Sequence, residues 1–547
     1  MDTPSLVFRN GHVFDGHRHR PGHGAAVAGG RVAAVVPEAD LDMFVGPRTE
    51  VVDLAGGLLL PGFQDAHAHP VQAGVERLRC DLTTVGTRAE YLDVVRGYAQ
   101  AHPERPWLLG GGWAMPVFGT AGPRAIDLDT VVSERPVFLA NRDHHGAWVN
   151  TATLRVAGIH RNTPDPVDGR IERDASGQPT GTLHEGAMAL VQRHVPPTTD
   201  EEHDRALVVA QQYLHSLGVT AWQDAILGAY GGNADPASTY LRAAQRDVLT
   251  ARVRGALWWE RGAGLEQIED LVERRATFTH GRLNAGTVKV MQDGIVENAT
   301  AAMSRPYLDG QGGCTDNAGL SFVDPQLLCR AVTSLDREGF QVHVHAIGDR
   351  AVTETLDAFA TARLANGRSA NRHHVAHLQV VAPADRPRFA DLDVTANMQA
   401  LWAVNDEAMT ELTLPYLDEE LAGWQYPFGS LVRAGARLAA GSDWPVSTPD
   451  PLQAIHVAVN RTPAAVGFAA EPLLPDEALS LRQAFAAYTS GSAFVNHLDD
   501  AGVLAPGMRA DLALLDRDPF GEDPAAIGSC TVRATYVDGR LVHRVST

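Results

Sequence analysis

Lysine is almost absent from this chain of 547 residues. A single lysine, Lys289, stands among 46 basic residues, and the others are all arginine. Lysine is ordinarily one of the commonest residues, although a genome biased toward arginine codons removes it without a functional reason. The segment "AGTVKVM" around Lys289 is a mostly apolar run of strand length. Because a buried lysine is costly unless it is paired or chemically altered, the sequence predicts a special role for it.

Cysteines and long apolar runs are also scarce. The four cysteines contain no CxxC pair, which argues against a thiolate zinc site and a disulfide framework. No run of 18 apolar residues is present, which argues against a membrane span. The segment "MDTPSLVFRNGHVFDG" lacks the charged and apolar regions of a signal peptide. These absences predict a soluble cytoplasmic protein.

Positive charge is in deficit, since the net charge is −20 at pH 7. This balance disfavours nucleic acid and anionic membranes as partners. Hydrophobic residues make up 44% of the chain and charged residues 20%, a composition that supports a large core and argues against global disorder. The sequence leaves a homodimer open.

The middle of the chain alternates short apolar runs with segments of helical periodicity, such as "DRALVVAQQYLHSLG". Strand followed by helix, repeated eight times, is typical of a (β/α)8 barrel. The sequence therefore predicts an α/β protein of this class. The candidate strands cover residues 58–65, 218–224, 251–259, 285–293, 340–349, 373–379, 394–400 and 437–443.

Both ends of the chain have the pattern of short strands with turns. "SLVFRNGHVFDG" contains an Asn-Gly turn signal and "VRATYVDGRLV" an Asp-Gly one. Residues 1–60 and 501–547 are therefore predicted to build one small β-domain beside a barrel over 61–500. About 150 residues separate the first two candidate strands, too many for a βα connection. An inserted subdomain is therefore expected at about 74–200.

Histidine and aspartate recur at the predicted strand ends, where the chemistry of such barrels is found. His67 and His69 in "QDAHAHP" are two residues apart, so strand alternation points both toward one face. Imidazole and carboxylate suit Zn, Fe, Ni or Mn. Each HxH pair alone is a weak signal, but several strand ends in barrel order predict a metal site. The further candidates are Lys289, His343, His345, His373, His374, His377 and Asp443.

The chemistry of lysine offers a reason why Lys289 was kept. A neutral amine can add CO₂ and become a carbamate, an anion whose two oxygens can bridge two cations. Arginine has no accessible neutral amine for this reaction. A structural or charge-pairing lysine is the alternative.

Several motifs resemble landmarks of the amidohydrolase superfamily, and together they cover nearly the whole chain. They are "LLLPGFQDAHAHP", "LHSLGVTAWQD", "VHAIGDRAV", "HHVAHLQ", "AAGSDWPV" and "LAPGMRADLALLD". "VKVMQDG", "HAIGDRAV" and "DHHGAWVN" resemble the branch that includes N-substituted formamide deformylases. The resemblance implies a (β/α)8 barrel with a β-sandwich built from both termini. Where that family has "PGKxAD", this chain has "PGMRAD", so a lysine was given up there while Lys289 was kept.

The resemblance also implies a set of metal ligands. His67, His69 and Asp443 would bind one ion, His345 and His377 a second, and a carboxylated Lys289 would bridge them. Zn is expected, as one or two ions, because superfamily members differ in metal count. His343, His373 and His374 do not match ligand positions and are expected to support the site or to pack.

The implied reaction is the hydrolysis of a non-peptide C–N bond in a small-molecule substrate, an N-substituted amide or a formamide-like compound. Metal-activated water would attack the carbonyl, with Asp443 as proton shuttle. His145 would donate a hydrogen bond to the oxyanion, or would only pack. Trp113 is a candidate substrate wall or a core residue. Asp293 and Arg305 are candidates for substrate binding, with capping and salt bridges as alternatives.

Two other functions stay open at this point. A deaminase or lactonase would use the same barrel, because a fold does not determine a substrate. A non-catalytic small-molecule binding protein would keep the fold without the reaction, although the complete ligand set favours an enzyme.

Overall fold

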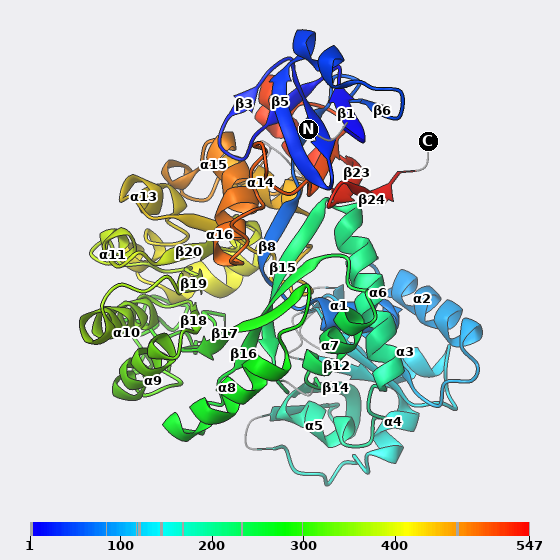
Figure 1. The fold of residues 1–547 in the computed structure, drawn as a ribbon. Helices are drawn as coiled ribbons and strands as arrows, with labels where there is room; N and C mark the ends of the chain where they lie inside the picture. The colour runs from blue at the N-terminus through cyan, green and yellow to red at the C-terminus, as the bar shows by residue number, and fades with distance from the viewer. Residues whose placement is uncertain are drawn as a thin grey trace. The chain divides into compact units, whose positions relative to one another are not determined.

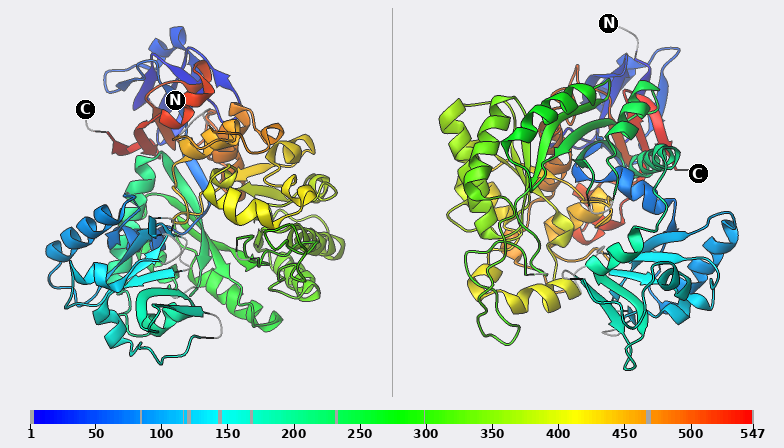
Figure 2. Two further views of the ribbon diagram at one scale, coloured as in Figure 1. Left: turned by 180° about the vertical axis from the view of Figure 1, so that it is seen from behind. Right: turned by 90° about the horizontal axis from the view of Figure 1, so that it is seen from below.

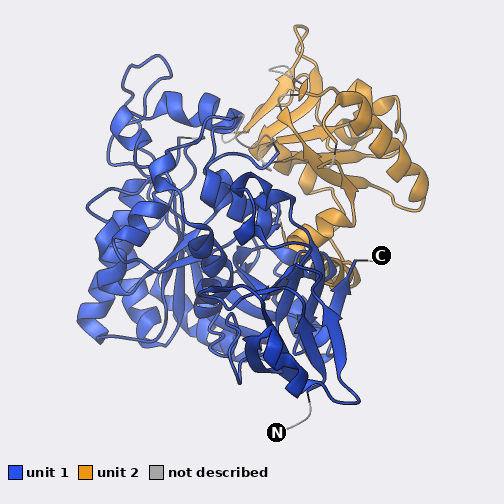
Figure 3. Cartoon of the chain, turned by 90° about the horizontal axis from the view of Figure 1, so that it is seen from above, with its two compact units in different colours: residues 1–70, 211–230, 235–547 blue, residues 71–210, 231–234 orange. Residues whose placement is uncertain are grey.

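The computed structural model describes residues 4–83, 85–115, 117–118, 122–142, 146–166, 169–230, 233–297, 299–465 and 470–545. The chain divides into two compact units, coloured separately in Figure 3. The first unit joins residues 1–70, 211–230 and 235–547, and the second joins 71–210 and 231–234. The domain boundaries drawn from the sequence stay a prediction, because this division leaves barrel and terminal sheets together.

A sheet of eight parallel strands forms the centre of the first unit (Figure 1). Most of its residues are buried, as expected when helices cover a parallel sheet on one side and the barrel interior fills the other. The predicted (β/α)8 class is confirmed. In sheet order the strands are β8 (Phe63–Ala68), β15 (Val219–Leu227), β16 (Arg252–Trp258), β17 (Leu283–Met291), β18 (Gln341–Ala346), β19 (His374–His377), β20 (Thr395–Met398) and β21 (Leu438–Ala440).

Backbone hydrogen bonds join the two ends of this sheet just beyond the strands. The amide of Asp443, which follows β21, donates to the carbonyl of His67 in β8 at 2.8 Å. The amide of His69 donates back to the carbonyl of Trp444 at 2.8 Å. This exchange nearly closes the barrel and places the residues after the first and last strands side by side.

The outer helices show why the alternating sequence folds this way. In α9 (Pro325–Arg337), Asp324 caps the first turn by accepting a hydrogen bond from the amide of Leu327 at 2.9 Å. Apolar residues then recur at helical spacing and turn toward the sheet; those buried are Leu328, Ala331, Val332 and Leu335. Beside it runs α10 (Asp349–Asn366), and α8 (Ile268–Thr277) precedes β17. Within the described residues, no helix is long and apolar enough to cross a membrane.

Strands from both termini build two further sheets of the first unit, drawn in blue and red in Figures 1 and 2. The core between the two sheets takes residues from both ends of the chain, for example Phe8 against Tyr536 with ring centroids 5.3 Å apart. One sheet has the order β5 (Arg31–Pro37), β4 (His23–Ala28), β1 (Leu6–Arg9) and β6 (Glu50–Asp53). The other has the order β24 (Arg540–Arg544), β23 (Val532–Val537), β22 (Leu512–Leu515), β7 (Leu58–Pro61), β2 (His12–Phe14) and β3 (His19–Arg20).

The first predicted barrel strand, residues 58–65, is two strands in the structure. β7 pairs with β2 and β22 in a terminal sheet, and only β8 enters the barrel. Gly62 lies between them, and a Cβ at this position would meet the side chain of Thr220 at 2.3 Å. The chain therefore passes from one sheet to the other at a residue where no side chain fits.

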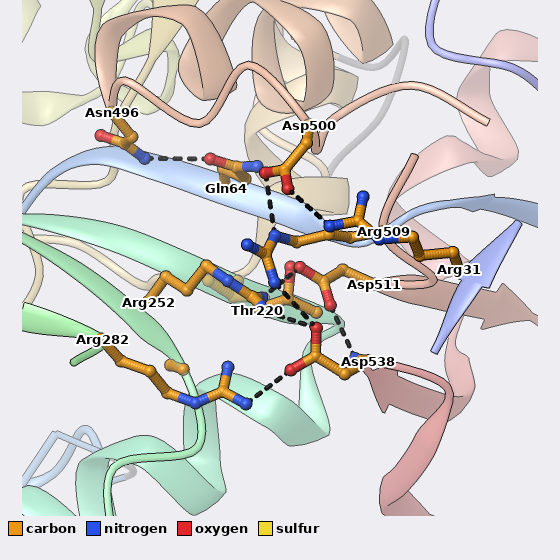
Figure 4. A network of polar contacts seen from close by, with 12 residues as sticks. Arg31, Gln64, Thr220, Arg252, Arg282, Asn496, Asp500, Arg509, Asp511 and Asp538 are labelled. Carbon is orange, nitrogen blue, oxygen red and sulfur yellow. Dashed lines mark hydrogen bonds and ion pairs between the residues drawn. The ribbon is translucent and has the colours of Figure 1, made fainter. Parts of the chain in front are cut away.

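An ion-pair cluster joins the barrel to the terminal strands (Figure 4). Arg252, the first residue of β16, pairs with both Asp511 and Asp538. Asp538 also pairs with Arg282 at 2.5 Å and with Arg509 at 3.3 Å. Asp511 accepts a further hydrogen bond from the backbone amide of Asp538 at 2.8 Å. Within this cluster each carboxylate faces a guanidinium.

The second unit contains a sheet of six strands with its own apolar cores, one of which includes Trp113 and Trp148. The sheet order is β13 (Gly169–Arg173), β14 (Pro179–Glu185), β12 (Gly146–Val149), β11 (Val137–Asn141), β10 (Leu108–Trp113) and β9 (Cys80–Asp81). Its helices include α2 (Arg88–Ala101), α3 (Ala125–Asp129), α4 (Thr151–Val156) and α5 (Gly186–Gln192).

Candidate metal centre

Three possible metal ligands meet where the barrel closes. Asp443 Oδ1 lies 3.2 Å from His67 Nε2 and 3.1 Å from His69 Nε2. The three ligand atoms all lie within 4.8 Å of one another. The backbone exchange between the two ends of the sheet brings these residues together, although His69 and Asp443 are 374 positions apart in the sequence.

The histidines of β18 and β19 lie next to this group. The ring of His377 is 4.8 Å from that of His67 and 4.3 Å from that of His345, measured between centroids. Within the described part of the chain, the buried Nδ1 of His377 has no hydrogen-bond partner. His345 Nε2 lies 3.1 Å from the carbonyl oxygen of Gly294. We call His67, His69, His345, His377, Asp443 and Lys289 the ligand cluster.

Two members of the ligand cluster adopt a backbone conformation that side chains rarely take. His377 has φ 79° and Asp443 has φ 55°. The amide of His377 donates to Gln399 Oε1 at 2.7 Å, and the amide of Asp443 donates to the carbonyl of His67. Such strained residues persist only when their surroundings hold them, and they concentrate at functional sites.

Lys289 lies on β17 and is only 3% exposed. The strand register places it beside His343, and it places Met291 beside His345. Among the described residues, no acceptor lies within hydrogen-bonding distance of its amine. Burial lowers the pKa of Lys289 to about 7, which Asp443 only partly offsets. The predicted buried lysine is therefore a group that loses its proton near neutral pH.

The charge states of the ligand cluster suit a divalent cation. Burial, assisted by the charge of Lys289, lowers the pKa of His67 and of His345 to about 3, so both rings are neutral. Burial alone would raise the pKa of Asp443, but the neighbouring imidazoles outweigh it and hold that pKa well below its ordinary value. Metal ligands must be deprotonated in this way.

A chain of hydrogen bonds fixes which nitrogen of His67 carries the proton. Gln341 Nε2 donates to two backbone carbonyls, those of Arg372 and Val495, each at 2.8 Å. Its Oε1 must therefore accept from Gln223 Nε2 at 3.1 Å, so Gln223 Oε1 faces His343 Nδ1 at 2.7 Å. Because a carbonyl oxygen only accepts, His343 Nδ1 is the protonated nitrogen.

The tautomer of His343 determines which nitrogen of His67, a member of the ligand cluster, carries the proton. His343 Nε2 has no proton in the neutral ring, so it accepts from His67 Nδ1 at 3.0 Å. His67 Nε2 then presents a lone pair to the ionised Asp443 at 3.2 Å. Two acceptors facing each other at this distance are compatible when a cation binds both. The donor set therefore fits a metal ion.

Asp65 positions the two chain segments that carry the ligands. Its carboxylate accepts hydrogen bonds from the amide of His67 at 2.9 Å and from the amide of Ser442 at 3.1 Å. It also accepts from the hydroxyl of Ser442 at 2.5 Å. Burial raises the pKa of Asp65 to about 7. The sequence analysis did not single out Asp65, Ser442 or Gln223; the only signal was their place in the "QDAHAHP", "AAGSD" and "AWQD" segments.

His374 of β19 and His373, the residue before this strand, lie outside the ligand cluster. His374 Nε2 is 3.1 Å from Gln223 Oε1, beside His343. His373 Nε2 is 3.0 Å from Asp336 Oδ1, and its Nδ1 accepts from the amide of Val342. His374 thus supports the barrel interior through Gln223, whereas His373 connects the outer helix α9 to β18.

The structure places the predicted substrate-binding residues in different settings. Trp113 is 1% exposed in a core of the second unit, and its indole donates to the carbonyl of Leu139 at 2.9 Å. Arg305 is exposed and pairs with Asp418 and Glu420. His145, the predicted oxyanion donor, lies outside the described residues.

Asp293 contributes to the ligand cluster rather than to an open surface. It is fully buried and accepts hydrogen bonds from the amides of Ala302, Ile347 and Gly348. Its Oδ1 also lies 3.6 Å from His345 Nε2. These contacts hold Asp293 beside a member of the ligand cluster, and its predicted role in substrate binding stays a prediction.

A second histidine–carboxylate group lies in a terminal sheet. His12, His19 and Asp518 also place one ligand atom each within 4.8 Å of the others. All three side chains are partly exposed, and His19 Nε2 is 2.9 Å from Asp518 Oδ2. This group has to be considered whenever metal is counted in the protein.

The chain is similar to known proteins over nearly its whole length. The model of the family described as "Amidohydrolase family" matches residues 50–543. Protein LONG AFTER FAR-RED 3 of Arabidopsis thaliana is 32% identical, over 98% of this chain and 91% of its own length. N-substituted formamide deformylase of Arthrobacter pascens is 28% identical, over 94% of each chain.

A solved structure shows the same similarity. The uncharacterized metal-dependent hydrolase from Pyrococcus furiosus has a TM-score of 0.73 and 26% identity, over 94% of this chain and 99% of its own. The match covers nearly the whole of both chains. The chain belongs to the amidohydrolase family, and a divalent metal and a hydrolytic reaction come with that membership.

Proposed function

We propose that this protein hydrolyses a non-peptide C–N bond in an N-substituted amide or formamide of small size. The observation that carries the proposal is the pairing of a neutral His67 Nε2 with the ionised carboxylate of Asp443 at 3.2 Å. The similarity to N-substituted formamide deformylase supports the choice of bond. A deaminase or lactonase on the same barrel remains the alternative.

The ligand cluster would hold the metal. His67, His69 and Asp443 would bind one ion, and His345 and His377 a second. When bound, a divalent ion such as Zn²⁺ supplies a Lewis acid that polarises a carbonyl and lowers the pKa of water. The neutral histidines and the tautomer imposed through His343 keep nitrogen lone pairs directed at this position.

Asp443 would serve as the proton shuttle. Its carboxylate is ionised, so it can take a proton from the attacking water and later give it to the leaving nitrogen. The strained backbone at Asp443 and the hydrogen bond from its amide to the His67 carbonyl hold the side chain in place. A carboxylate fixed in this way needs little reorganisation during the reaction.

Lys289 would carry a carbamate that bridges the two ions. Its pKa of about 7 leaves part of the amine neutral at physiological pH, the form that adds CO₂. Its amine has no hydrogen-bond acceptor among the described residues, which leaves the amine free to react. A carbamate would replace a buried cation with an anion beside the metal ligands.

The direct test combines metal removal with a change at Asp443. Chelation should abolish hydrolysis of a panel of N-formyl and N-acetyl amines, and added Zn²⁺ or a related ion should restore it. Asp443→Asn should lower kcat by at least ~100-fold, the scale of acid–base catalysis, while most of the metal is retained. Full activity in a verified metal-free preparation, or normal turnover in the variant, would refute the proposal.

A further inference from the structure

We propose that Arg261 binds a carboxylate on the substrate, so that the protein prefers amides that also carry this anionic group. The inference rests on the proposed function for the reaction itself, but it concerns a different part of the site. It starts from an arginine that the sequence analysis did not single out and that the metal chemistry does not use.

Arg261 lies at the end of the barrel where the ligand cluster lies. It follows β16 by three positions, and its Nη2 contacts the sulfur of Met291 at 2.7 Å. Met291 is two residues beyond Lys289 on β17, and the register places it beside His345. Because side chains two apart share a face, Met291 points the same way as Lys289, one step closer to the carboxyl ends of the strands. Arg261 is therefore next to the layer of the ligand cluster.

The charge of Arg261 is not neutralised by the described part of the chain. Its guanidinium lies 4.1 Å from the ring centre of Phe322 and 6.0 Å from that of Trp258. Its Nε is buried and has no hydrogen-bond partner among the described residues. None of the ion pairs formed by those residues includes Arg261, although the chain has a net charge of −20.

Arg305 is a contrasting arginine, because its charge is paired with carboxylates of the chain itself. It pairs with Asp418 at 3.3 Å and also with Glu420, so its charge is already satisfied. Stacking on aromatic faces, by contrast, holds the plane of Arg261. Its Nη2 donates to the sulfur of Met291, which is a weak acceptor, and no carboxylate of the described residues faces its N–H edge. That edge matches a carboxylate, which can accept two parallel hydrogen bonds from one guanidinium.

The surroundings of Arg261 also fit an apolar body attached to the anionic group. Tyr230 is 38% exposed and lies 4.8 Å from Trp258, measured between ring centroids. Its hydroxyl contacts the sulfur of Met291 at 3.6 Å. Tyr230, Trp258, Met291 and Phe322 thus place aromatic and thioether surface around one cation. An amide with an aryl group and a carboxylate would match both features.

The test compares two amides that differ only in the carboxylate. N-formylphenylalanine and N-formylphenethylamine are assayed with the metal-loaded protein, and the ratio of their kcat/KM values is the readout. The ratio should favour the carboxylate by about 10- to 100-fold, the range of a charge-assisted hydrogen bond, and it should fall toward 1 in Arg261→Met. Arg261→Lys keeps the charge without the planar fork and should retain part of the preference.

Arg275 provides a matched control. Its guanidinium also lies over an aromatic ring, that of Phe340 at 4.1 Å, and it donates to the carbonyl of Glu338. Arg275→Met removes one positive charge from α8, as Arg261→Met removes one after β16, and it should leave the ratio of the two kcat/KM values unchanged. An equal ratio in the unmodified protein and in Arg261→Met, or a preference for the neutral amide, would overturn the inference.

A binding measurement separates this inference from the proposed reaction. Quenching of tryptophan fluorescence by 3-phenylpropanoate and by 3-phenylpropan-1-ol is titrated in the metal-loaded protein. If neither amide is hydrolysed but Arg261→Met weakens binding of the carboxylate at least ~10-fold, the anion site stands and the proposed reaction fails. If carboxylate binding is the same in Arg261→Met, the metal or another group binds it and the inference is wrong.

Discussion

Two buried polar groups of the first unit differ in how well their charges are satisfied. In the ion-pair cluster at the start of β16, Arg252 faces both Asp511 and Asp538, and each carboxylate has further donors. In the ligand cluster at the other end of the strands, Lys289 has no acceptor among the described residues. In the same described part of the chain, His377 Nδ1 has no hydrogen-bond partner, and His67 Nε2 directs a lone pair at a carboxylate.

The difference separates a structural group from one prepared for a ligand. Buried charges are tolerated when they are paired and hydrogen-bonded, and the ion-pair cluster meets this condition without outside help. The ligand cluster meets it only when a cation joins its acceptors. Polar residues at one end of the barrel therefore stabilise the fold, whereas those at the other end require a bound cation. Each of these two roles can be tested.

Lys289→Arg should have the largest effect. Arginine keeps a positive charge and rough size, so a structural lysine would tolerate the change. A carbamate bridge would not, because arginine supplies no oxygen ligand and adds a permanent cation beside the metals. We expect loss of one or both ions and a fall in kcat/KM of at least ~1,000-fold, measured by metal analysis and amide hydrolysis.

The metal analysis of Lys289→Arg must exclude ions bound at the second histidine–carboxylate group. A His19→Ala change in every sample removes the histidine–carboxylate group of the terminal sheet from the count. Lys289→Ala with an added short carboxylic acid is the companion, since that acid can occupy the place of the carbamate and recover part of the activity. Wild-type activity in Lys289→Arg would show that Lys289 bridges nothing.

Arg252→Met should act on stability rather than on metal. It leaves the buried Asp511 without its guanidinium, while the half-buried Asp538 keeps Arg282 and Arg509, and we expect a cost of about 3 kcal/mol of unfolding free energy. Denaturant unfolding measures this loss, and the metal content of the folded protein should not change. Arg96→Met breaks an exposed pair with Asp93 and should cost less than ~1 kcal/mol. A large loss of metal in Arg252→Met would contradict the separation of the two groups.

A further expected effect concerns the pH dependence of the metal-free protein. The pKa of Lys289 falls from 10.5 to about 7 on burial, so between these values the unfolded chain binds a proton that the folded chain does not. Stability therefore rises with pH in this window. Lys289→Met should be more stable than the unmodified protein at pH 7, and its advantage should shrink by about 1.4 kcal/mol per pH unit toward pH 10. A constant difference would show that the amine stays charged.

The barrel strands were predictable from the sequence, because the strands of a buried parallel sheet are short runs of apolar residues. Seven of the eight predicted segments overlap a single barrel strand, for example residues 285–293 against β17 (Leu283–Met291). Residues 58–65 divide between two sheets at Gly62, where a side chain would meet Thr220, and periodicity does not record this change of sheet. The proximity of His67, His69 and Asp443 also followed from barrel order.

The polar partners of each side chain were not predictable, since they depend on three-dimensional neighbours. Nothing in "SRPYLDG" indicates that Arg305 is paired with carboxylates, and nothing in "WWERGAG" indicates that Arg261 is not. The tautomer of His67 depends on Gln341, which is 274 positions away in the chain and acts through Gln223 and His343. Such relations appear only when the barrel is assembled.

The closure of the barrel by Asp443 and His69 has a consequence for how the protein is made. A ribosome releases the first pair of histidines long before it reaches the carboxylate 374 positions later, so the nascent chain cannot hold metal in the final arrangement. Domains generally fold as units during synthesis, and loop closure over such a distance carries an entropic cost. Capture of the ion through His67, His69 and Asp443 would therefore mark the end of barrel folding, and a chain truncated before Asp443 would lack this coordination.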